Sequence, residues 1–131
     1  HDYCHDNKAL HDAYDEFANG GPIHDFIYEG KSYHGEPVII SEYGGIKWSS
    51  GCDENSWGYG DAPTTEDEFI QRYKGLTEAI LNHSNIMGFC YTQLYDVEQE
   101  QNGLMTYDRK FKFDPEIFRK MNTQVAAIEK N

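Results

Sequence analysis

Positive charge is scarce in this sequence. Its 131 residues include 11 lysines and arginines against 23 aspartates and glutamates, which gives a formal net charge of −12 at pH 7. Phosphate groups repel such a surface, so the charge argues against nucleic acid and against an anionic membrane as partners. No apolar run reaches the length of a transmembrane helix, and no basic-then-apolar signal peptide opens the chain.

Cysteine is also sparse, with Cys4, Cys52 and Cys90 at wide spacings. An odd number of cysteines without a paired spacing matches neither a zinc site nor a redox motif. The pattern is typical of unpaired thiols in a reducing compartment. This cysteine usage slightly favours the cytoplasm as the location, although a targeting signal preceding His1 would direct the protein elsewhere.

A metal site is not predicted from the histidines near the start of the chain. Cys4 and His5 are adjacent, and His5 and His11 lie six residues apart. Neither spacing places both side chains on one helix face, as a separation of four residues would. We therefore expect no metal and no cofactor.

Aromatic residues are abundant, at 15% of the chain, and 10 of them are tyrosines. Such side chains form flat apolar surfaces that still make hydrogen bonds, as sugar and peptide sites do. The hydrophobic content of 38% indicates a globular chain, long enough for one ordinary domain with a core.

Helices and strands are predicted to alternate along the chain. Thr65 with Glu68 forms a capping-box pattern at one helix start, and Asp114 followed by proline forms another. The predicted helices span residues 7–18, 65–83 and 114–128, and two apolar runs predict buried strands at residues 37–41 and 86–91. This order predicts an α/β fold with a parallel pair of strands.

The two predicted strands need further partners, because two parallel strands do not make a stable sheet alone. His1-Asp2-Tyr3 reads like the end of a strand or loop that begins upstream. We expect residues 1–131 to be a single piece of a longer polypeptide, whose remainder supplies the missing strands.

The first predicted strand leads to a carboxylate, Glu42, followed after Tyr43 by two glycines. The end of a buried parallel strand is where α/β enzymes place catalytic groups. Glu42 is therefore a candidate catalytic residue that needs a second carboxyl. The alternative is a glutamate that caps a helix or faces solvent.

Two segments resemble glycoside hydrolase family 2, which includes β-galactosidases, β-glucuronidases and β-mannosidases. They are Ile40-Ser41-Glu42-Tyr43-Gly44-Gly45 and Tyr91-Thr92-Gln93-Leu94-Tyr95-Asp96-Val97-Glu98-Gln99-Glu100-Gln101-Asn102-Gly103-Leu104-Met105-Thr106-Tyr107-Asp108-Arg109. The resemblance covers essentially the whole chain.

The resemblance implies the C-terminal portion of a (β/α)8 TIM barrel. The strands at 37–41 and 86–91 would be its seventh and eighth, accompanied by helices six, seven and eight. A barrel of this kind needs about 250 residues, so the chain would be its last third to half and incomplete as a barrel.

The resemblance also implies a mechanism. Glu42 matches the nucleophile of a retaining exo-β-glycosidase, which needs a second carboxyl as acid and base. In the family that residue belongs to an Asn-Glu pair, and no residue of this chain is assigned to it. Glu54-Asn55 has these two residues in the reverse order and lies in a different loop from the family's Asn-Glu pair. The chain alone is expected to be inactive.

Substrate-binding positions follow from the same resemblance. Tyr3 matches a tyrosine that hydrogen-bonds the nucleophile. The family places a tryptophan under the sugar at a position occupied here by Thr92, beside Tyr91. Trp48 or Trp57, from the long loop at residues 43–63, is expected to supply the platform instead. Equally, these tryptophans could pin the loop by hydrophobic contact.

The acidic loop after the second strand bears on the sugar. Glucuronidases carry an Asn-x-Lys motif there, whereas this chain reads Glu100-Gln101-Asn102. Glu98 and Glu100 would repel a uronic acid, so we expect a neutral sugar such as galactose or mannose, and a β-galactosidase-like enzyme.

Two other functions remain open. A non-catalytic carbohydrate-binding or assembly module would use the aromatic residues for stacking alone. Copies of the chain could also exchange strands, because exposed parallel strand edges invite self-association.

Overall fold

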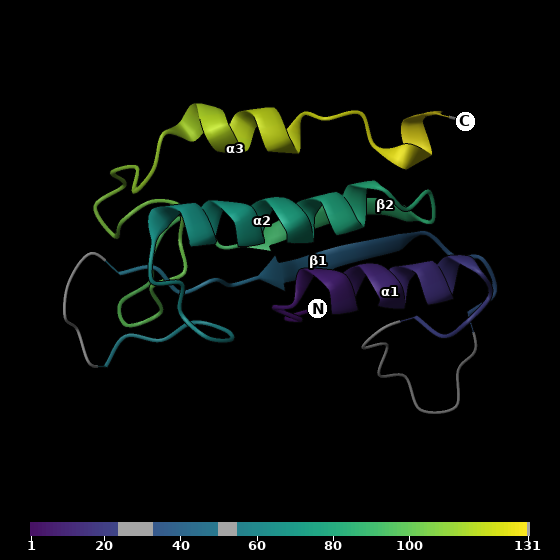
Figure 1. Cartoon of the computed structure of the whole chain (residues 1–131), viewed down its shortest axis with the longest axis horizontal. Helices are drawn as coiled ribbons and strands as arrows, with labels where there is room; N and C mark the ends of the chain where they lie inside the picture. Colours follow the sequence, from purple (N-terminus) through teal and green to yellow (C-terminus); the bar gives the residue numbers. More distant parts are fainter. Residues whose placement is uncertain (24–32, 50–54, 131) are drawn as a thin grey trace.

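The computed structural model describes residues 1–23, 33–49 and 55–130. Its elements, in chain order, are α1 (Asn7–Ala18), β1 (Val38–Gly44), α2 (Glu66–Leu81), β2 (Ile86–Thr92), α3 (Pro115–Asn122) and the 3-10 helix η1 (Ala127–Lys130). Figure 1 shows α1 and α2 side by side along the strands, with α3 on the far side of α2.

The sheet consists of β1 and β2, which pair in parallel as predicted. Val38 lies opposite Ile86, and Tyr43 lies opposite Tyr91. Tyr43 also forms a parallel bridge with Asp2, so the opening residues lie along β1. β1 is longer than predicted and includes Glu42, because these non-local hydrogen bonds continue past the apolar run.

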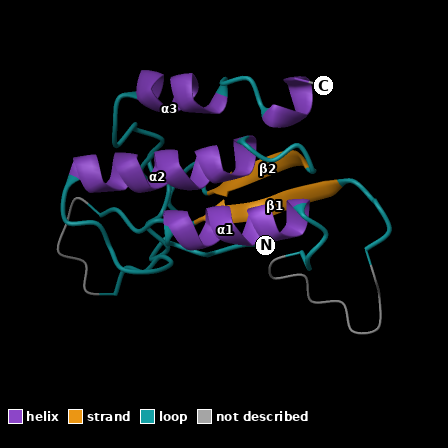
Figure 2. Cartoon of the chain, turned by 45° about the vertical axis from the view of Figure 1, so that its right-hand side comes forward, coloured by secondary structure: helices purple, strands orange, loops and turns teal. Residues whose placement is uncertain are grey.

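The two faces of the sheet differ in their surroundings, as the alternation of side chains along a strand requires. Ile40 and Ile86 are 5% and 4% exposed and belong to the core beneath the helices. Ile39 and Met87 are 64% and 57% exposed. Figure 2 shows both strands beside α1 and α2. One side of the sheet is thus left apolar and open.

α2 and α3 begin at the predicted capping residues, whereas the cap of α1 was not predicted. Asp6 accepts a hydrogen bond from the backbone N–H of Ala9 at 2.7 Å at the start of α1. Thr65 does the same for Glu68 at 3.1 Å at the start of α2. The Glu68 carboxylate accepts the backbone N–H of Thr64 at 2.7 Å and also hydrogen-bonds the backbone of Thr65, as in a capping box.

The core is largely aromatic. Phe69 from α2 stacks on Phe113 with ring centroids 4.4 Å apart, and Phe118 from α3 packs against both. Tyr43 is fully buried, and its hydroxyl lies 2.7 Å from that of Thr77 on α2. This contact joins the sheet to the helix that connects its strands.

The expectation of a (β/α)8 barrel portion is wrong. The described residues form a small α/β unit with three α-helices and a two-stranded parallel sheet. It is too small and too sparse in helices to be strands seven and eight of a barrel with helices six to eight. The sequence itself supports one strand–helix–strand unit, and the barrel came from the resemblance alone.

The last helix is shorter than predicted. α3 ends at Asn122, and residues 127–130 form η1 instead of continuing it to residue 128. The Thr123 hydroxyl and the Gln124 amide bind the carbonyls of Arg119 and Met121, and these bonds close the helix end.

Part of the predicted organisation lies outside the described residues. Cys52 and Glu54 belong to the portion of the long loop at 50–54 that is not described. A membrane-spanning helix needs about 20 mostly apolar residues, and none of the helices in the described part of the chain meets that requirement.

Candidate carboxylate site at Glu42

Glu42 lies near the carboxyl end of β1, with its side chain 39% exposed. Its backbone carbonyl accepts the N–H of Asp2 at 2.8 Å. Asp2 is 3% exposed, and its carboxylate accepts hydrogen bonds from the Tyr14 hydroxyl and the Cys4 N–H at 2.8 and 3.1 Å. These bonds hold the opening residues against the strand.

Two side chains from the opening segment contact the same oxygen of Glu42. The Tyr3 hydroxyl donates to Oε2 at 2.5 Å, and Nδ1 of His1 lies 3.2 Å from it. Burial, followed by the hydrogen bond to Glu42, raises the pKa of Tyr3 above its ordinary value. Tyr3 therefore keeps its proton near neutral pH and serves as a donor to the Glu42 side chain.

Tyr59 fixes the position of the Tyr3 ring. The two rings stack with centroids 3.6 Å apart and planes 9° apart. Gly45, at φ +60°, lies under both: a Cβ there would stand 2.4 Å from the Tyr59 ring and 3.2 Å from the Tyr3 ring. A side chain at position 45 would push the stacked pair away, which explains the second glycine after Glu42.

The first of these glycines makes room for Tyr91. Gly44 has φ +83°, and a Cβ there would stand 2.4 Å from the Tyr91 ring. The Tyr91 hydroxyl accepts from the N–H of Ile46 at 3.3 Å and donates to the carbonyl of Asn102 at 3.2 Å. Tyr91 thus braces the two loops that follow the strands. Thr92, the next residue, hydrogen-bonds Tyr3.

The two tryptophans occupy different environments. Trp57 is 45% exposed and meets the Tyr59 ring edge-on, with centroids 5.9 Å apart. Trp48 packs against Phe69 and Phe113 at the core, with centroids 6.0 and 5.7 Å away. Tyr3, Tyr59 and Trp57 therefore form an aromatic row, whereas Trp48 holds its loop to the core.

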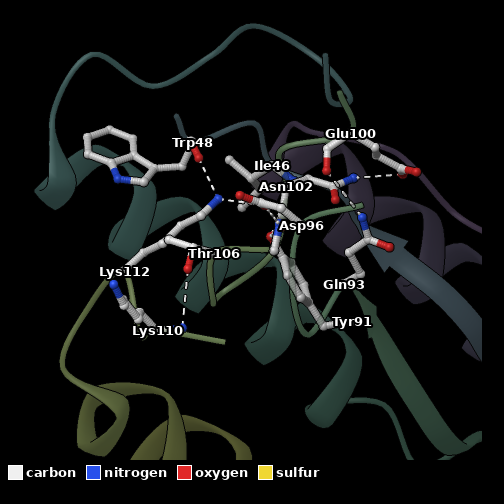
Figure 3. Close-up of polar contacts among 11 residues, drawn as sticks. Ile46, Trp48, Tyr91, Gln93, Asp96, Glu100, Asn102, Thr106, Lys110 and Lys112 are labelled. Atoms are coloured by element: carbon white, nitrogen blue, oxygen red, sulfur yellow. Dashed lines mark hydrogen bonds and ion pairs between the residues drawn. The ribbon is translucent and has the colours of Figure 1, made fainter. Parts of the chain in front are cut away.

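A buried ion pair supports the loops beside the site. Figure 3 shows the Lys112 ammonium between the Asp96 carboxylate and the Trp48 carbonyl, at 2.7 and 2.6 Å. The side chains of Lys112 and Asp96 are almost fully buried, at 5% and 10% exposure. Burial lowers the pKa of Lys112, while Asp96 opposes that shift.

The acidic loop is joined directly to the aromatic row. The backbones of Trp57 and Glu100 form a bridge, and the Trp57 N–H donates to the Gln99 carbonyl at 2.8 Å. Glu100 also accepts a hydrogen bond from the fully buried Asn102 at 3.1 Å. Glu100 is thus fixed beside the exposed Trp57, and Glu98 is exposed in the same loop.

The structure brings together Glu42, Tyr3 and Thr92, and connects Trp57 to them through Tyr59. It places Trp48 and Tyr91 among packing contacts. The predicted hydrogen bond from Tyr3 to Glu42 is present, while the roles of these residues in substrate binding stay predictions. Sequence reasoning assigned no site role to His1. The glycine at position 45, three residues after Glu42, was the sequence signal that an aromatic ring packs closely against the end of β1.

A comparison with protein-family models and with curated proteins found no match to this chain. The chemistry therefore has to be argued from the site. A half-exposed carboxylate with a fixed hydroxyl donor on one oxygen can act as a nucleophile, as a base, or as an acceptor for a bound hydroxyl group. The adjoining aromatic row suits a flat polar ligand such as a sugar ring.

Proposed function

We propose that this chain is part of a retaining exo-β-glycosidase and that Glu42 is its nucleophile. The observation that carries the proposal is the hydrogen bond from Tyr3 to Oε2 of Glu42. Among the described residues both contacts of the carboxylate go to Oε2, so Oε1 is the oxygen that attacks. The resemblance of the two segments to glycoside hydrolase family 2 supports the same role.

The proposed reaction has two steps. Glu42 attacks the anomeric carbon and forms a covalent glycosyl-enzyme, and water then releases the sugar with its configuration retained. A second carboxyl, about 5–5.5 Å away, must first protonate the leaving group and then deprotonate the water. No residue of this chain is assigned to that role, so the remainder of the polypeptide would supply it, and the chain alone would be inactive.

Tyr3 has a defined part in this scheme. Its hydroxyl holds the rotamer of Glu42 and stabilises the ionised carboxylate before attack. The stack on Tyr59 restrains the Tyr3 ring beside the carboxylate. The proposal rests on this local arrangement and not on the overall fold, because catalytic sites of one chemistry occur on unrelated folds.

The proposed substrate is a terminal β-linked neutral sugar, with a β-galactoside preferred. Trp57 provides exposed ring surface next to Tyr59, which is itself stacked on Tyr3. Glu100, held next to Trp57, would repel the carboxylate of a uronic acid. A full-length enzyme that cleaved a nitrophenyl glucuronide faster than the galactoside would contradict this specificity.

Trapping the covalent intermediate tests the nucleophile directly. A 2-deoxy-2-fluoro-β-galactoside with a dinitrophenolate leaving group slows both steps but still allows attack, because that group leaves without protonation. Incubation with the full-length enzyme should add one fluorosugar to the peptide that contains Glu42, as detected by mass spectrometry. A label on another carboxylate would contradict the assignment.

A non-catalytic carbohydrate-binding module is the second candidate, favoured by the 45% exposure of Trp57. Under this alternative, galactose or its oligomers would quench tryptophan fluorescence equally in the parent and in Glu42→Gln. Trp57→Ala would abolish the signal. Under the enzyme proposal, Glu42→Gln changes turnover instead.

The open apolar face of the sheet supports a partner for this chain. Ile39 and Met87 are well exposed there, and such a surface favours association. We propose that the remainder of the polypeptide covers it. Light scattering on the isolated chain would detect self-association, the competing possibility.

A further inference from the structure

Three side chains with metal-binding atoms converge at a second place in the molecule. His11 and Asp15 lie one turn apart on α1, and His83 follows the end of α2. One ligand atom from each side chain lies within 4.8 Å of the others. The imidazole rings of His11 and His83 meet edge-on, with centroids 5.2 Å apart.

His83 faces hydrogen-bond acceptors at both ring nitrogens. Nδ1 lies 2.5 Å from the carbonyl oxygen of Ala79, and Nε2 lies 2.8 Å from Oδ1 of Asp15. A carbonyl and a carboxylate only accept, whereas a neutral imidazole donates from one nitrogen alone. When Nδ1 donates to the carbonyl, either a proton or a metal ion can bridge Nε2 and the carboxylate oxygen that faces it.

This arrangement is the one that metal-binding histidines adopt. A bond from Nδ1–H to a backbone carbonyl fixes the tautomer and leaves Nε2 as the ligand. His83 is 5% exposed and therefore has a fixed orientation. Its ring is held at one nitrogen by the protein, and the other nitrogen is directed at Asp15.

The second imidazole approaches the other oxygen of the same carboxylate. Nδ1 of His11 lies 3.2 Å from Oδ2 of Asp15. Ligands about 2.0 Å from a tetrahedral zinc ion stand roughly 3.3 Å apart, so small side-chain adjustments would admit an ion. His11 and Asp15 are 45% and 54% exposed, which gives an ion access from solvent.

We propose that His11, Asp15 and His83 bind a divalent transition metal ion of the zinc type. Two imidazoles and one carboxylate suit Zn²⁺ or Co²⁺ and disfavour Mg²⁺ and Ca²⁺, which prefer oxygen ligands. Water would complete the coordination shell on the exposed side.

The ion would cross-link α1 to the connection between α2 and β2. The His83 carbonyl accepts the N–H of Ile86, so this site lies at the amino end of β2. Thr92, beside Tyr3, lies at the opposite end of that strand. The metal proposal is therefore separate from the glycosidase proposal, and its role is to stabilise the fold.

Cobalt provides the direct test, because its visible ligand-field spectrum reports tetrahedral coordination. The cysteines are first alkylated, so that thiols do not bind the metal. One equivalent of Co²⁺ should then produce the spectrum, Zn²⁺ should displace it, and Zn²⁺ should raise the thermal midpoint of unfolding. Absence of the spectrum, or an unchanged midpoint, would overturn the proposal.

Matched variants locate the site. His11→Ala and Asp15→Asn, both on an exposed helix surface, should weaken Zn²⁺ binding at least about tenfold. His34→Ala, which removes an exposed histidine elsewhere, should leave binding unchanged. If metal binding survived both site variants, or if His34→Ala weakened it equally, this cluster would not be the site.

Discussion

The rings of Tyr3 and Tyr59 lie flat on each other, with centroids 3.6 Å apart, directly above the backbone of Gly45. The stack couples the long loop after β1 to the residue that donates to Glu42. The position of the Glu42 donor therefore depends on the absence of a side chain at Gly45.

Gly45→Ala tests this dependence. An alanine with left-handed backbone costs about 1–2 kcal/mol, and the contact with Tyr59 adds to that cost. Urea unfolding should show a total loss of more than about 2 kcal/mol. Gly20→Ala is the matched control, since Gly20 also has a positive φ but a methyl group added there would meet nothing within 4 Å. Equal losses in both variants would refute the coupling.

Stability should fall at high pH, and Tyr3 should contribute to that fall. Burial raises the pKa values of Tyr3 and Tyr43 in the folded state. Unfolded tyrosine ionises near pH 10, so the contribution is complete below about pH 10 and is lost as pH rises toward the folded pKa. Urea unfolding across this range should show the decline.

Two tyrosine variants test whether Tyr3 contributes to this pH dependence. Tyr3→Phe should make the decline shallower, because the variant removes one group whose pKa is raised by folding. Tyr107→Phe, at a side chain that is 60% exposed, should leave the slope as in the parent. A steeper decline in Tyr3→Phe would contradict the assigned direction.

Substitution of one member of the Asp96–Lys112 pair should destabilise the fold strongly. Asp96→Ala leaves a buried ammonium without its carboxylate, which costs about 3–5 kcal/mol. Asp12→Ala breaks the exposed pair with Lys8 and should leave stability almost unchanged, because solvent screens that pair. Chemical denaturation of both variants provides the comparison, and similar losses would show that burial of the pair is unimportant.

Glu42→Gln in the full-length enzyme should lower kcat by several orders of magnitude. The amide oxygen still accepts from Tyr3, so folding should be preserved while the nucleophile is lost. Glu98→Gln, an exposed acid in the neighbouring loop, is the control and should retain turnover. With Glu42→Ala, added azide should give the α-galactosyl azide, because the anion attacks from the vacated side. Full activity of Glu42→Gln would end the proposal.

Local patterns predicted much of the fold. Leu10, Tyr14 and Phe17 recur at helical spacing and are buried along α1, which spans the predicted residues. The extension of β1 to Gly44 was not predictable from its apolar run. It depends on pairing with Asp2 and Tyr91, which are distant in sequence.

The candidate sites were predictable to unequal degrees. Glu42 and its bond to Tyr3 came from a motif and a resemblance, whereas the stack on Tyr59 requires a loop to fold back. At the metal-binding cluster, the spacing of His11 and Asp15 was visible in the sequence. His83 lies 68 positions from Asp15, and only the packing of α1 on α2 brings them together.

The attachment of the opening residues has a practical consequence for sample handling. Cleavage of the polypeptide after Tyr3 would remove the Glu42 donor, and it would separate the Tyr14 hydroxyl from the carboxylate of Asp2. Cleavage sites for removable tags should therefore be placed outside residues 1–3.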